Sequence, residues 1–459
     1  MSAWSILEAV RNNPEKLRWS QRRRGLDPSV VDQAVRLDAK WRKARAKVSE
    51  LQRQRNEVSR RIAKTKNQKE KQQLIRETKL LSEKVSKEEQ RVEKIEKQRT
   101  AVLRSIPNIT HESVPEGKDE TENRPIKYIG KPRVWQEYLE QFLADAQGVP
   151  AEYTVTEEQP FSHYDISEQT GMIDIERAAK TSGARYYYLT HDVVFLDLAL
   201  ALYALDSISR FGFKPIIPPH LLTHAAYSGV TDIGAFEDAL YKLEDLDLYL
   251  IATSEHPIAA RFMNEVLEIE ELPLLFAGYS PCYRKEAGAH GKDTKGIFRV
   301  HQFSKVEQFV FCHPDDSWEW MEKMIKYVED IWRPLGLPFR IVNMCSGDLG
   351  KVAAKTYDME VWMPSQGKYR EMVSCSNCTD YQSARLDLRF AEKRGYPTKG
   401  FVHTLNSTVI ATTRAITAVL ENNRQSDGRI LIPKPLLKYL KPIEAAPSKY
   451  ITPLHMRES

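Results

Sequence analysis

Cysteine is scarce in this chain of 459 residues, which has only five, at positions 282, 312, 345, 375 and 378. So few and so scattered cysteines do not build a disulfide framework, and a reducing compartment is the simpler expectation. Long apolar runs are also missing, because the longest, Val193–Leu205, is interrupted by Asp197 and falls short of the roughly 20 residues that span a bilayer. The first residues carry charges where a signal peptide needs its apolar stretch. These absences predict a cytoplasmic protein that does not enter a membrane.

Two common nucleotide-binding loops are also absent from the sequence. It contains neither a G-x-x-x-x-G-K-[ST] loop nor a G-x-G-x-x-G loop that follows a strand, so neither of these phosphate-binding folds is predicted. The chain is longer than a domain with a single hydrophobic core usually is, so its length predicts two or three domains. Apolar residues make up 41% of the chain, which is enough for a sizeable core.

Glycine and proline are both missing from residues 36–104, and this segment is strongly basic. It holds 23 Lys and Arg against 10 Asp and Glu, a net charge of +13, whereas the whole chain carries +5. A polar stretch at Lys64–Gln68 divides it into two halves of similar length, which predicts an antiparallel helical hairpin roughly 50 Å long. Positions with the alternating spacing of four and three of a coiled-coil seam are Leu37, Trp41, Ala44, Val48, Leu51, Arg55, Val58 and Ile62, and then Leu74, Thr78, Leu81, Val85, Glu88, Val92, Ile95, Arg99 and Val102.

The basic hairpin has two interpretations. A solvated strut or a dimerisation hairpin is the simpler one, because charged helix faces are usually only soluble faces. A neutral strut would mix Lys with Glu evenly, however, whereas this segment is more than two-to-one basic. That bias suits a polyanion whose counterions the protein releases on binding, so we favour a nucleic acid as partner.

The composition changes after the hairpin. Residues 105–125, "SIPNITHESVPEGKDETENRP", contain the prolines and acidic residues typical of a linker. We therefore expect an N-terminal domain over residues 1–110, with its coiled coil at about 28–106, a linker over 111–132 and a second domain over 133–459.

Charged residues interrupt a stretch that otherwise resembles a strand pair, expected at Pro281–Glu286 and Gly296–Phe311 around a polar loop. Because side chains two apart share a face of a strand, this pairing would put Arg284 with Glu286. The same rule would align Arg299, His301, Phe303 and Glu307. Unpaired charges are costly to bury, so either these groups pair on a surface hairpin or they face a polar ligand.

The ordered set of motifs resembles class II aminoacyl-tRNA synthetases, and within them the archaeal and eukaryotic cytosolic-like seryl-tRNA synthetase family. "GFKPIIPP", which ends at Pro219, resembles motif 1. Arg284-Lys285-Glu286 with "FRVHQF" at 298–303 resembles motif 2, and "LNSTVIATTRAITAVLEN" at 405–422 resembles motif 3. "TSEHP" at 253–257 and "REMVSCSNCTDYQ" at 370–382 are similar to the seryl family in particular. The family's Gln-Ala-Arg-Arg is here Gln382-Ser383-Ala384-Arg385, so one basic residue is missing.

The resemblance implies an α+β protein in which an N-terminal antiparallel two-helix coiled coil precedes a class II catalytic domain with an antiparallel sheet flanked by helices. It implies a serine–tRNA ligase that joins L-serine and ATP to seryl-adenylate and passes the seryl group to tRNA(Ser), held by the coiled-coil arm. Whether tRNA(Sec) is charged as well is left open. It also implies Mg²⁺ with the ATP, and a homodimer formed through motif 1.

The resemblance also implies which residues bind ATP. Arg284 and Arg414 would be catalytic, with Arg284 on the serine carboxylate and α-phosphate and Arg414, together with Arg299, on the terminal phosphates. Glu286 would accept from the adenine amino group and Phe303 would stack on the ring. Glu371 and Ser374 would supply hard oxygens to Mg²⁺. The full implied set is Arg284, Lys285, Glu286, Arg299, Val300, Phe303, Glu371, Met372, Val373, Ser374 and Arg414.

The implied serine site is smaller. Thr253 and Glu255 would bind the ammonium group, while Glu307 and Thr408 would receive the hydroxyl. A site built to hydrogen-bond a hydroxyl rejects alanine, because its own polar groups would be left without a partner. The implied set is Thr253, Ser254, Glu255, Arg284, Glu307, Asn406 and Thr408.

Three alternatives compete with this interpretation. A synthetase-like paralogue that binds nucleic acid without catalysis would be expected to lose its ATP-binding arginines, yet all of them are present here. A class II ligase for another amino acid is disfavoured by the Glu307 and Thr408 pair. The Cys375-x-x-Cys378 spacing fits half of a zinc site, but the sequence offers no second pair.

Overall fold

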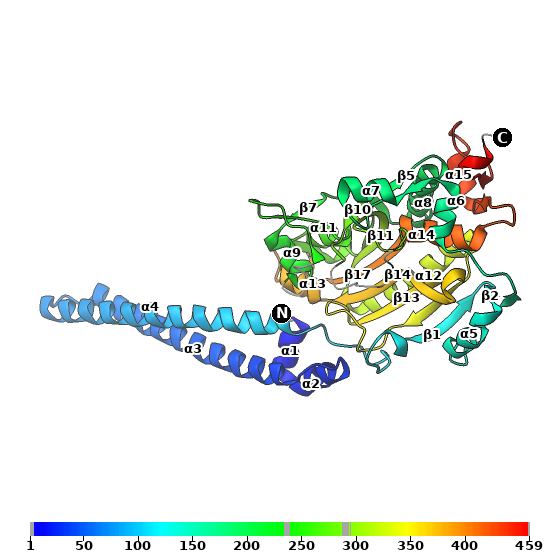
Figure 1. The fold of residues 1–459 in the computed structure, drawn as a ribbon. Helices are drawn as coiled ribbons and strands as arrows, with labels where there is room; N and C mark the ends of the chain where they lie inside the picture. Colours follow the sequence, from blue (N-terminus) through cyan, green and yellow to red (C-terminus); the bar gives the residue numbers. More distant parts are fainter. Residues whose placement is uncertain (1–3, 234–238, 287–292, 294, 458–459) are drawn as a thin grey trace. The chain divides into compact units, whose positions relative to one another are not determined.

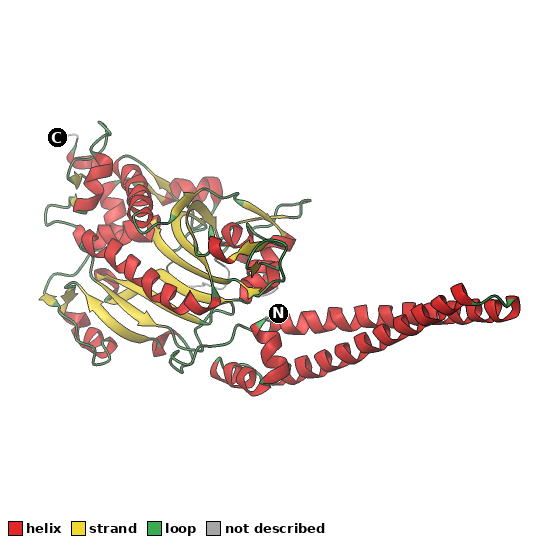
Figure 2. Ribbon diagram, turned by 180° about the vertical axis from the view of Figure 1, so that it is seen from behind, coloured by secondary structure: helices red, strands yellow, loops and turns green. Residues whose placement is uncertain are grey.

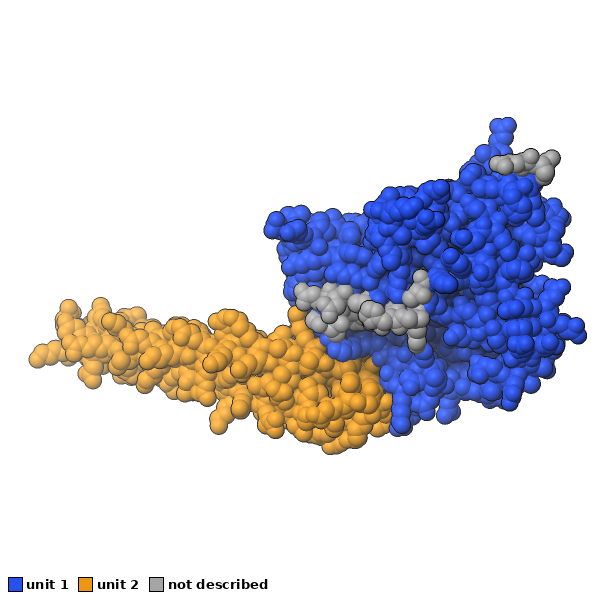
Figure 3. Space-filling view, viewed as in Figure 1, with its two compact units in different colours: residues 1–4, 110–459 blue, residues 5–109 orange. Residues whose placement is uncertain are grey.

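The computed structural model describes residues 4–233, 239–286, 293 and 295–457. The chain divides into two compact units, one of residues 5–109 and one of residues 110–459 together with the N-terminal residues 1–4. They are drawn in orange and blue in Figure 3. Within the described ranges, no helix has both the length and the apolar character needed to cross a membrane.

The smaller unit is entirely helical, with α1 (Ser5–Asn12), α2 (Pro14–Arg23), α3 (Ser29–Lys64) and α4 (Gln68–Ser105). Helices α3 and α4 run antiparallel along most of their length (Figure 1). Every position of the predicted seam is buried or half-buried. The side chain of Asn67 accepts from the amides of Lys69 and Glu70 and so begins α4. The predicted helical hairpin and its turn are therefore confirmed.

A buried carboxylate fixes the base of this hairpin. Asp38 of α3 is 1% exposed and lies 3.0 Å from Arg11 of α1 and 2.8 Å from Arg99 of α4. Burial acts to raise the pKa of Asp38, but its bonds to the two arginines outweigh burial and lower the pKa. Arg99 also stacks over Trp41, 4.6 Å from the ring centre. These contacts join three helices where the arm begins.

The larger unit is built on a sheet whose strands are drawn in yellow in Figure 2. Among the described residues it has eight strands, in the order β1-β12-β13-β14-β17-β11-β10-β6. Every pair is antiparallel except β10 with β6. The strands are β1 (Arg124–Ile129), β6 (Lys214–Ile216), β10 (Leu274–Tyr283), β11 (Gln302–Cys312), β12 (Phe339–Asn343), β13 (Lys355–Met363), β14 (Lys368–Thr379) and β17 (His403–Ala411). The expected antiparallel sheet is confirmed.

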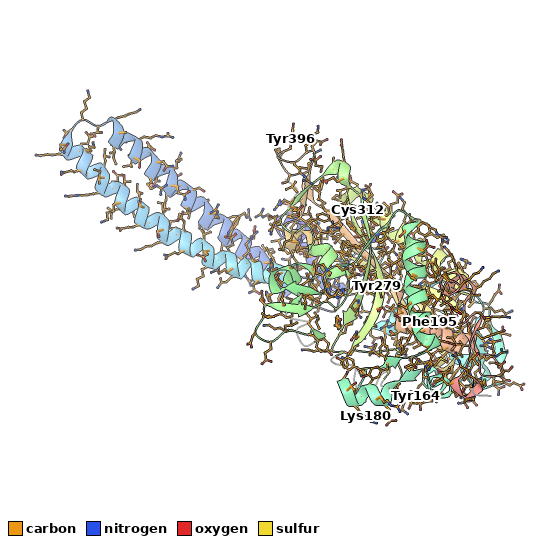
Figure 4. All side chains as sticks on the ribbon, turned by 90° about the horizontal axis from the view of Figure 1, so that it is seen from above. Tyr164, Lys180, Phe195, Tyr279, Cys312 and Tyr396 are labelled. Atoms are coloured by element: carbon orange, nitrogen blue, oxygen red, sulfur yellow. The ribbon has the colours of Figure 1, made fainter. Side chains whose placement is uncertain are left out.

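Three helices cover one face of this sheet, namely α8 (Asp192–Ser209), α12 (Ser317–Trp332) and α14 (Thr412–Asn423). Their apolar sides and the sheet form the main core. Phe195 of α8 and Tyr279 of β10, both labelled in Figure 4, pack partly buried against it. On the other face, α9 (His224–Val230), α11 (Glu255–Ala260) and α13 (Tyr381–Leu386) enclose a second core around Phe309 and Phe311. The rest of that face carries polar side chains.

Shorter elements surround the two cores. Among the described residues, the remaining helices of four residues or more are α5 (Leu139–Asp145), α6 (His163–Thr170), α7 (Ile175–Ser182) and α15 (Leu437–Leu440). The small strand sets are β2 (Arg133–Trp135) with β3 (Thr154–Thr156), β4 (Ile173–Asp174) with β5 (Tyr188–Leu189), β7 (Leu221–Thr223) with β8 (Leu248–Leu250), β15 (Arg389–Ala391) between β9 (Val266–Glu268) and β16 (Gly400–Phe401), and β18 (Ile430–Leu431) with β19 (Tyr450–Ile451).

The segment expected as a linker, residues 111–132, belongs to the larger unit in the structure. Strand β1 lies within it and pairs with β12 at the edge of the sheet. The residues of β1 alternate poorly between buried and exposed positions, and half of them are exposed. An edge strand with so much solvent-facing surface has the polar composition of a linker, which is why composition alone does not distinguish the two.

The expected strand pair at 281–286 and 296–311 is placed differently in the structure. Pairing ends where Tyr283 meets Gln302, so Arg284 and Glu286 lie beyond β10, and Arg299 lies before β11. The chain leaves the sheet because the amide of Lys285 donates to Ala239 O at 3.0 Å, and Glu286 then takes a positive φ of 50°. Most of the expected loop between the strands, residues 287–292 and 294, lies outside the described residues.

Candidate active site

A bulge in β14 decides which of its side chains face away from the helices. Glu371 pairs with Glu360, but Val373 pairs with the next residue, Met359, so Met372 is an extra residue in the ladder. Directly paired residues point to the same face, and Ser374 pairs with Asp358. Two residues three apart would normally point to opposite faces, and the bulge is the reason that Glu371 and Ser374 share one.

A second bulge acts in the same way between β11 and β17. Glu307 pairs with Thr408, whereas Val306 pairs with Ile410, so Val409 is the extra residue. Val306 and Ile410 lie in the main core, and Glu307 and Thr408 therefore point to the open face. The Thr408 hydroxyl donates to Glu307 Oε2 at 3.3 Å.

The residues expected to bind serine come together on this face. Asn406 Nδ2 donates to Glu255 Oε1 at 3.1 Å, and the amide of Glu255 donates to Thr253 Oγ1 at 3.2 Å. Ser254 is fully buried, and its hydroxyl donates to Gly278 O at 3.1 Å. The structure therefore gives the Ser254 hydroxyl a bond to the protein's own main chain.

Gly278 permits this close approach of the loop to the sheet. It pairs with Glu307 across β10 and β11. A Cβ at this position would lie 2.7 Å from Ser254 Oγ and 2.5 Å from Ile258 Cδ1. No side chain fits at such distances, so the loop that carries Thr253 and Glu255 depends on glycine here.

The structure adds three polar residues, Gln382, Thr404 and Lys305, that the implied sets do not contain. Gln382 Nε2 donates to Glu255 Oε1 at 2.9 Å, and Thr404 donates to the Gln382 amide oxygen at 2.8 Å. The ammonium of Lys305 lies 2.5 Å from Glu307 Oε2. Gln382 closes one of the motifs of the resemblance, and Lys305 is two residues before Glu307 on the same strand, so each has a signal in the sequence.

Burial and the neighbouring charge shift two titrating groups in this pocket. Burial and the nearby Glu307 carboxylate raise the pKa of Glu255 to about 7, against the opposing effect of Lys305. Burial, with the charges of Lys305 and Arg284, lowers the pKa of His256 to about 3. His256 is therefore neutral at pH 7, and its Nδ1 lies 2.9 Å from the Tyr227 hydroxyl.

Arg284, one of the arginines expected to bind ATP, lies close enough to these residues for its charge to act on Glu255. Arg284 Nε donates to Ala252 O at 3.3 Å, and its guanidinium lies 5.3 Å from the Phe303 ring centre. Arg299 Nη1 donates to Glu286 Oε2 at 3.0 Å. Two of the groups expected to act on different parts of ATP, Glu286 and Arg299, are thus paired with each other in this structure.

Phe298 brings two further arginines together. The guanidinium of Arg370 lies 4.3 Å from its ring centre and that of Arg414 lies 5.0 Å from it. Together with Arg299 and Glu371 they line a cavity of about 370 Å³. Burial acts to raise the pKa of Glu371, but Arg414 and Arg284 outweigh burial and lower the pKa. Glu371 is therefore ionised, and it shares the cavity wall with these arginines and with the acidic residues Glu120, Asp145 and Glu360.

Three of the eleven residues in the implied ATP set, Arg299, Glu371 and Arg414, line this cavity, and the other eight do not. Val300, Met372 and Val373 are buried in the helix-covered core, so only their main-chain groups remain for a nucleotide. The ammonium of Lys285 lies 5.7 Å from the Tyr241 ring centre. Sequence similarity places these four residues in the motifs but does not reveal the direction of their side chains.

The antiparallel sheet, its three motifs and the arginine-lined cavity define a class of protein. A family model described as "tRNA synthetase class II core domain (G, H, P, S and T)" matches residues 241–423. A second family model, "Seryl-tRNA synthetase N-terminal domain", matches residues 7–110. The larger unit is thus a class II aminoacyl-tRNA synthetase core.

Full-length relatives narrow the class to one family. The chain is 60% identical to a serine–tRNA ligase of Archaeoglobus fulgidus over 450 residues, 98% of this chain and 99% of the relative. The fold matches the crystal structure of seryl-tRNA synthetase from Pyrococcus horikoshii complexed with ATP, with a TM-score of 0.91, 47% identity and coverage of 97% and 99% of the two chains. It also matches the cytoplasmic serine–tRNA ligase of Naegleria fowleri in complex with AMP, with a TM-score of 0.83, 36% identity and coverage of 98% of both chains. The chain belongs to the serine–tRNA ligase family, which confirms the resemblance.

Proposed function

We propose that this protein is an ATP-dependent serine–tRNA ligase that forms seryl-adenylate and transfers the seryl group to tRNA(Ser). The observation that carries the proposal is the meeting of two hydrogen-bonded pairs, Thr408 with Glu307 and Asn406 with Glu255, beside a cavity lined by arginines. The two hydrogen-bonded pairs suit a small hydroxy amino acid, and the cavity lined by arginines suits a polyphosphate. A paralogue without catalytic activity is not favoured, since the arginines are retained.

In the adenylation step the serine carboxylate attacks the α-phosphorus of ATP, and pyrophosphate leaves. Charge gathers on phosphate oxygens, so catalysis needs fixed positive charge and alignment of the reacting atoms. Arg284 would hold the serine carboxylate and the α-phosphate, since its guanidinium adjoins both the serine pocket and Phe303, the proposed stacking partner of adenine. Arg299 and Arg414 would hold the terminal phosphates. To accept from the adenine amino group, Glu286 would have to exchange its bond to Arg299.

Glu371 and Ser374 would hold a Mg²⁺ ion that arrives with ATP. Two observations support the fit: the bulge at Met372 turns both side chains to one face, and Glu371 is ionised. Carboxylate and hydroxyl oxygens are ligands that Mg²⁺ accepts. The ion, when bound, neutralises charge on the phosphates.

Serine would bind with its ammonium group at Thr253 and Glu255 and its hydroxyl at Glu307 and Thr408. Asn406 would act through Glu255, to which it already donates. Because the Glu307 and Thr408 pair would lose a partner with alanine, discrimination against alanine would be strong.

The smaller unit would hold the tRNA. We infer that residues 1–110 form a tRNA-binding domain whose arm contacts phosphates, and that residues 133–459 form the catalytic domain. The net charge of +13 in residues 36–104 supports this division. We also propose a homodimer through the motif 1 segment, where the apolar side chain of Ile217 is 73% exposed. The cytoplasm is the proposed location.

ATP–pyrophosphate exchange with each of the twenty amino acids tests the activity. Serine should support exchange far above any other amino acid, and the same preparation should charge tRNA(Ser) with serine. Charging of tRNA(Sec) is measured in parallel and decides whether a second tRNA is a substrate. Stronger exchange with another amino acid, or none with any, would contradict the proposal.

A further inference from the structure

A buried lysine lies inside the serine pocket. Lys305 of β11 is 6% exposed and Glu307 is 2% exposed, and the ammonium lies 2.5 Å from Glu307 Oε2. A buried ion pair is costly to form, and removing one partner leaves an uncompensated charge. The second core, which α9, α11 and α13 enclose, lies on the same face of the sheet. An apolar side chain at position 305 could therefore be packed there. A charged pair at this place therefore calls for a reason other than stability.

Lys305 and Thr408 both contact one carboxylate oxygen of Glu307, Oε2, and not the other oxygen, Oε1. Thr408 donates to the same atom, Oε2, that Lys305 contacts. No residue of the described ranges makes a hydrogen bond to Oε1 of Glu307. The carboxylate is thus fixed from two sides through one oxygen, while its second oxygen remains able to accept from a ligand.

The cation also distinguishes the two carboxylates of the pocket. Glu255 receives only neutral donors, the amides of Asn406 and Gln382, whereas Glu307 is paired with an ammonium. A serine molecule brings one ammonium group and one hydroxyl. Its ammonium is drawn to the carboxylate that lacks a cation, which is Glu255, and its hydroxyl is left for the neutralised pair.

We propose that Lys305 is a positioning residue that fixes the direction in which serine lies in its pocket, by pairing with Glu307 and leaving Glu255 for the substrate ammonium. This inference rests on the proposed serine-activating function. Without Lys305 both carboxylates would attract the ammonium, and a serine bound at Glu307 would turn its carboxylate away from Arg284. The expected result is unproductive binding and a weaker preference for serine over alanine.

Lys305→Met tests the proposal, since methionine keeps most of the length and removes the charge. We expect kcat/KM for serine in ATP–pyrophosphate exchange to fall by roughly 100-fold, in the range for a broken buried pair, while KM for ATP stays within about twofold of wild type. The ratio of serine to alanine activation should fall as well. Lys305→Arg keeps the cation and should recover most of the loss.

A double-mutant comparison separates positioning from direct catalysis. In a Glu307→Gln background there is no second carboxylate to neutralise, so adding Lys305→Met should change kcat/KM by less than about threefold. Lys355→Met is the matched control, because Lys355 is also a buried lysine, 7% exposed, whose ammonium donates to the Tyr357 hydroxyl on the helix-covered side. It should leave the kinetics within about twofold of wild type.

Three results would overturn the proposal: unchanged serine kinetics in Lys305→Met, a parallel rise in KM for ATP, or an equal loss in the Glu307→Gln background. Thermal unfolding of each variant shows whether it is folded. If Lys305→Met does not fold, Lys305→Arg decides the question. Wild-type activity of Lys305→Arg would support the proposal, and activity as low as that of Glu307→Gln would overturn it. Failure of the wild-type protein to activate serine is a different result, because it contradicts the proposed function itself.

Discussion

Arg414 of α14 lies against both the side chain and the main chain of Glu371 in β14. Its Nη1 is 3.3 Å from Glu371 Oε2 and donates to Glu371 O at 2.9 Å. The expected phosphate-binding arginine is thus held beside the expected metal-binding carboxylate. A phosphate with its Mg²⁺ would meet both groups together.

Arg414→Ala should therefore lower serine-dependent ATP–pyrophosphate exchange by roughly 100- to 1,000-fold, the usual effect of losing one donor to charge that develops in the transition state. The thermal midpoint should change little. Arg429→Ala is the matched control, because Arg429 is a surface arginine paired with Asp427. Exchange at the wild-type rate in Arg414→Ala would remove this residue from the site.

Ser374→Ala should raise the Mg²⁺ concentration needed for half-maximal exchange, because it removes one of two hard oxygen ligands from the bulged strand. The effect should shrink at saturating Mg²⁺, and chelation should abolish exchange in both proteins. Ser376→Ala, on the same strand and face, is the control, since Ser376 pairs with Thr356 rather than with the metal-binding pair. An unchanged Mg²⁺ dependence would refute the role of Ser374.

Glu255→Gln should make serine binding insensitive to pH. The raised pKa of about 7 means that the wild-type carboxylate ionises near neutrality, and only the ionised form attracts the serine ammonium. KM for serine should therefore fall in the wild type between pH 6 and pH 8. In Glu255→Gln it should be higher and flat. A flat wild-type profile would argue against Glu255 as the ammonium ligand.

The same substitution should stabilise the protein without ligands at alkaline pH. Folded Glu255 keeps its proton up to about pH 7, whereas the unfolded chain loses it near pH 4.5. The free energy of unfolding therefore falls as the pH rises across this window, by an amount on the order of 1–3 kcal/mol. The full loss is reached above pH 7. The thermal midpoint of Glu255→Gln should exceed that of wild type at pH 8 but not at pH 4.5. Glu168→Gln, an exposed position of α6, should show no such difference.

Shortening the arm should separate the two half-reactions. Replacing residues 53–87 by a short Gly-Ser turn keeps the bonds of Gln52 to Glu89 and of Lys47 to Glu88, and it keeps the Asp38 cluster. Serine-dependent exchange should remain close to wild type, while charging of tRNA(Ser) should be lost. Wild-type tRNA affinity should also weaken with salt. Retained charging would show that tRNA is held elsewhere.

The helical hairpin could be predicted from sequence because its determinants are local. Each seam position repeats within a turn or two of the last, and the partner helix follows after three residues. The strand pair expected for motif 2 differs from the structure by several residues at its ends, because the ladder between β10 and β11 ends at Tyr283 and Gln302. That information lies in tertiary contacts such as the bond from Lys285 to Ala239 rather than in the residues of the strands themselves.

The site shows the same limit. The resemblance implies a site that combines Glu255, Glu307, Asn406 and Thr408, but nothing in the residues around Arg414 on helix α14 indicates that its partner is Glu371 on strand β14. Lys305 was missed because a lysine in an apolar strand is usually exposed. Its burial depends on the pairing with Glu307.

The extra residue Met372 has a consequence for how this strand tolerates change. Met372 is buried and belongs to the core, and it is the residue that lets Glu371 and Ser374 lie three apart and still share a face. Deleting Met372 alone would restore a regular ladder in which Glu371, Val373 and Ser374 alternate, so the two proposed Mg²⁺ ligands would stay on one face. The face that each ligand takes is therefore fixed by its partner on β13, Glu360 or Asp358, rather than by the spacing of the two residues along β14.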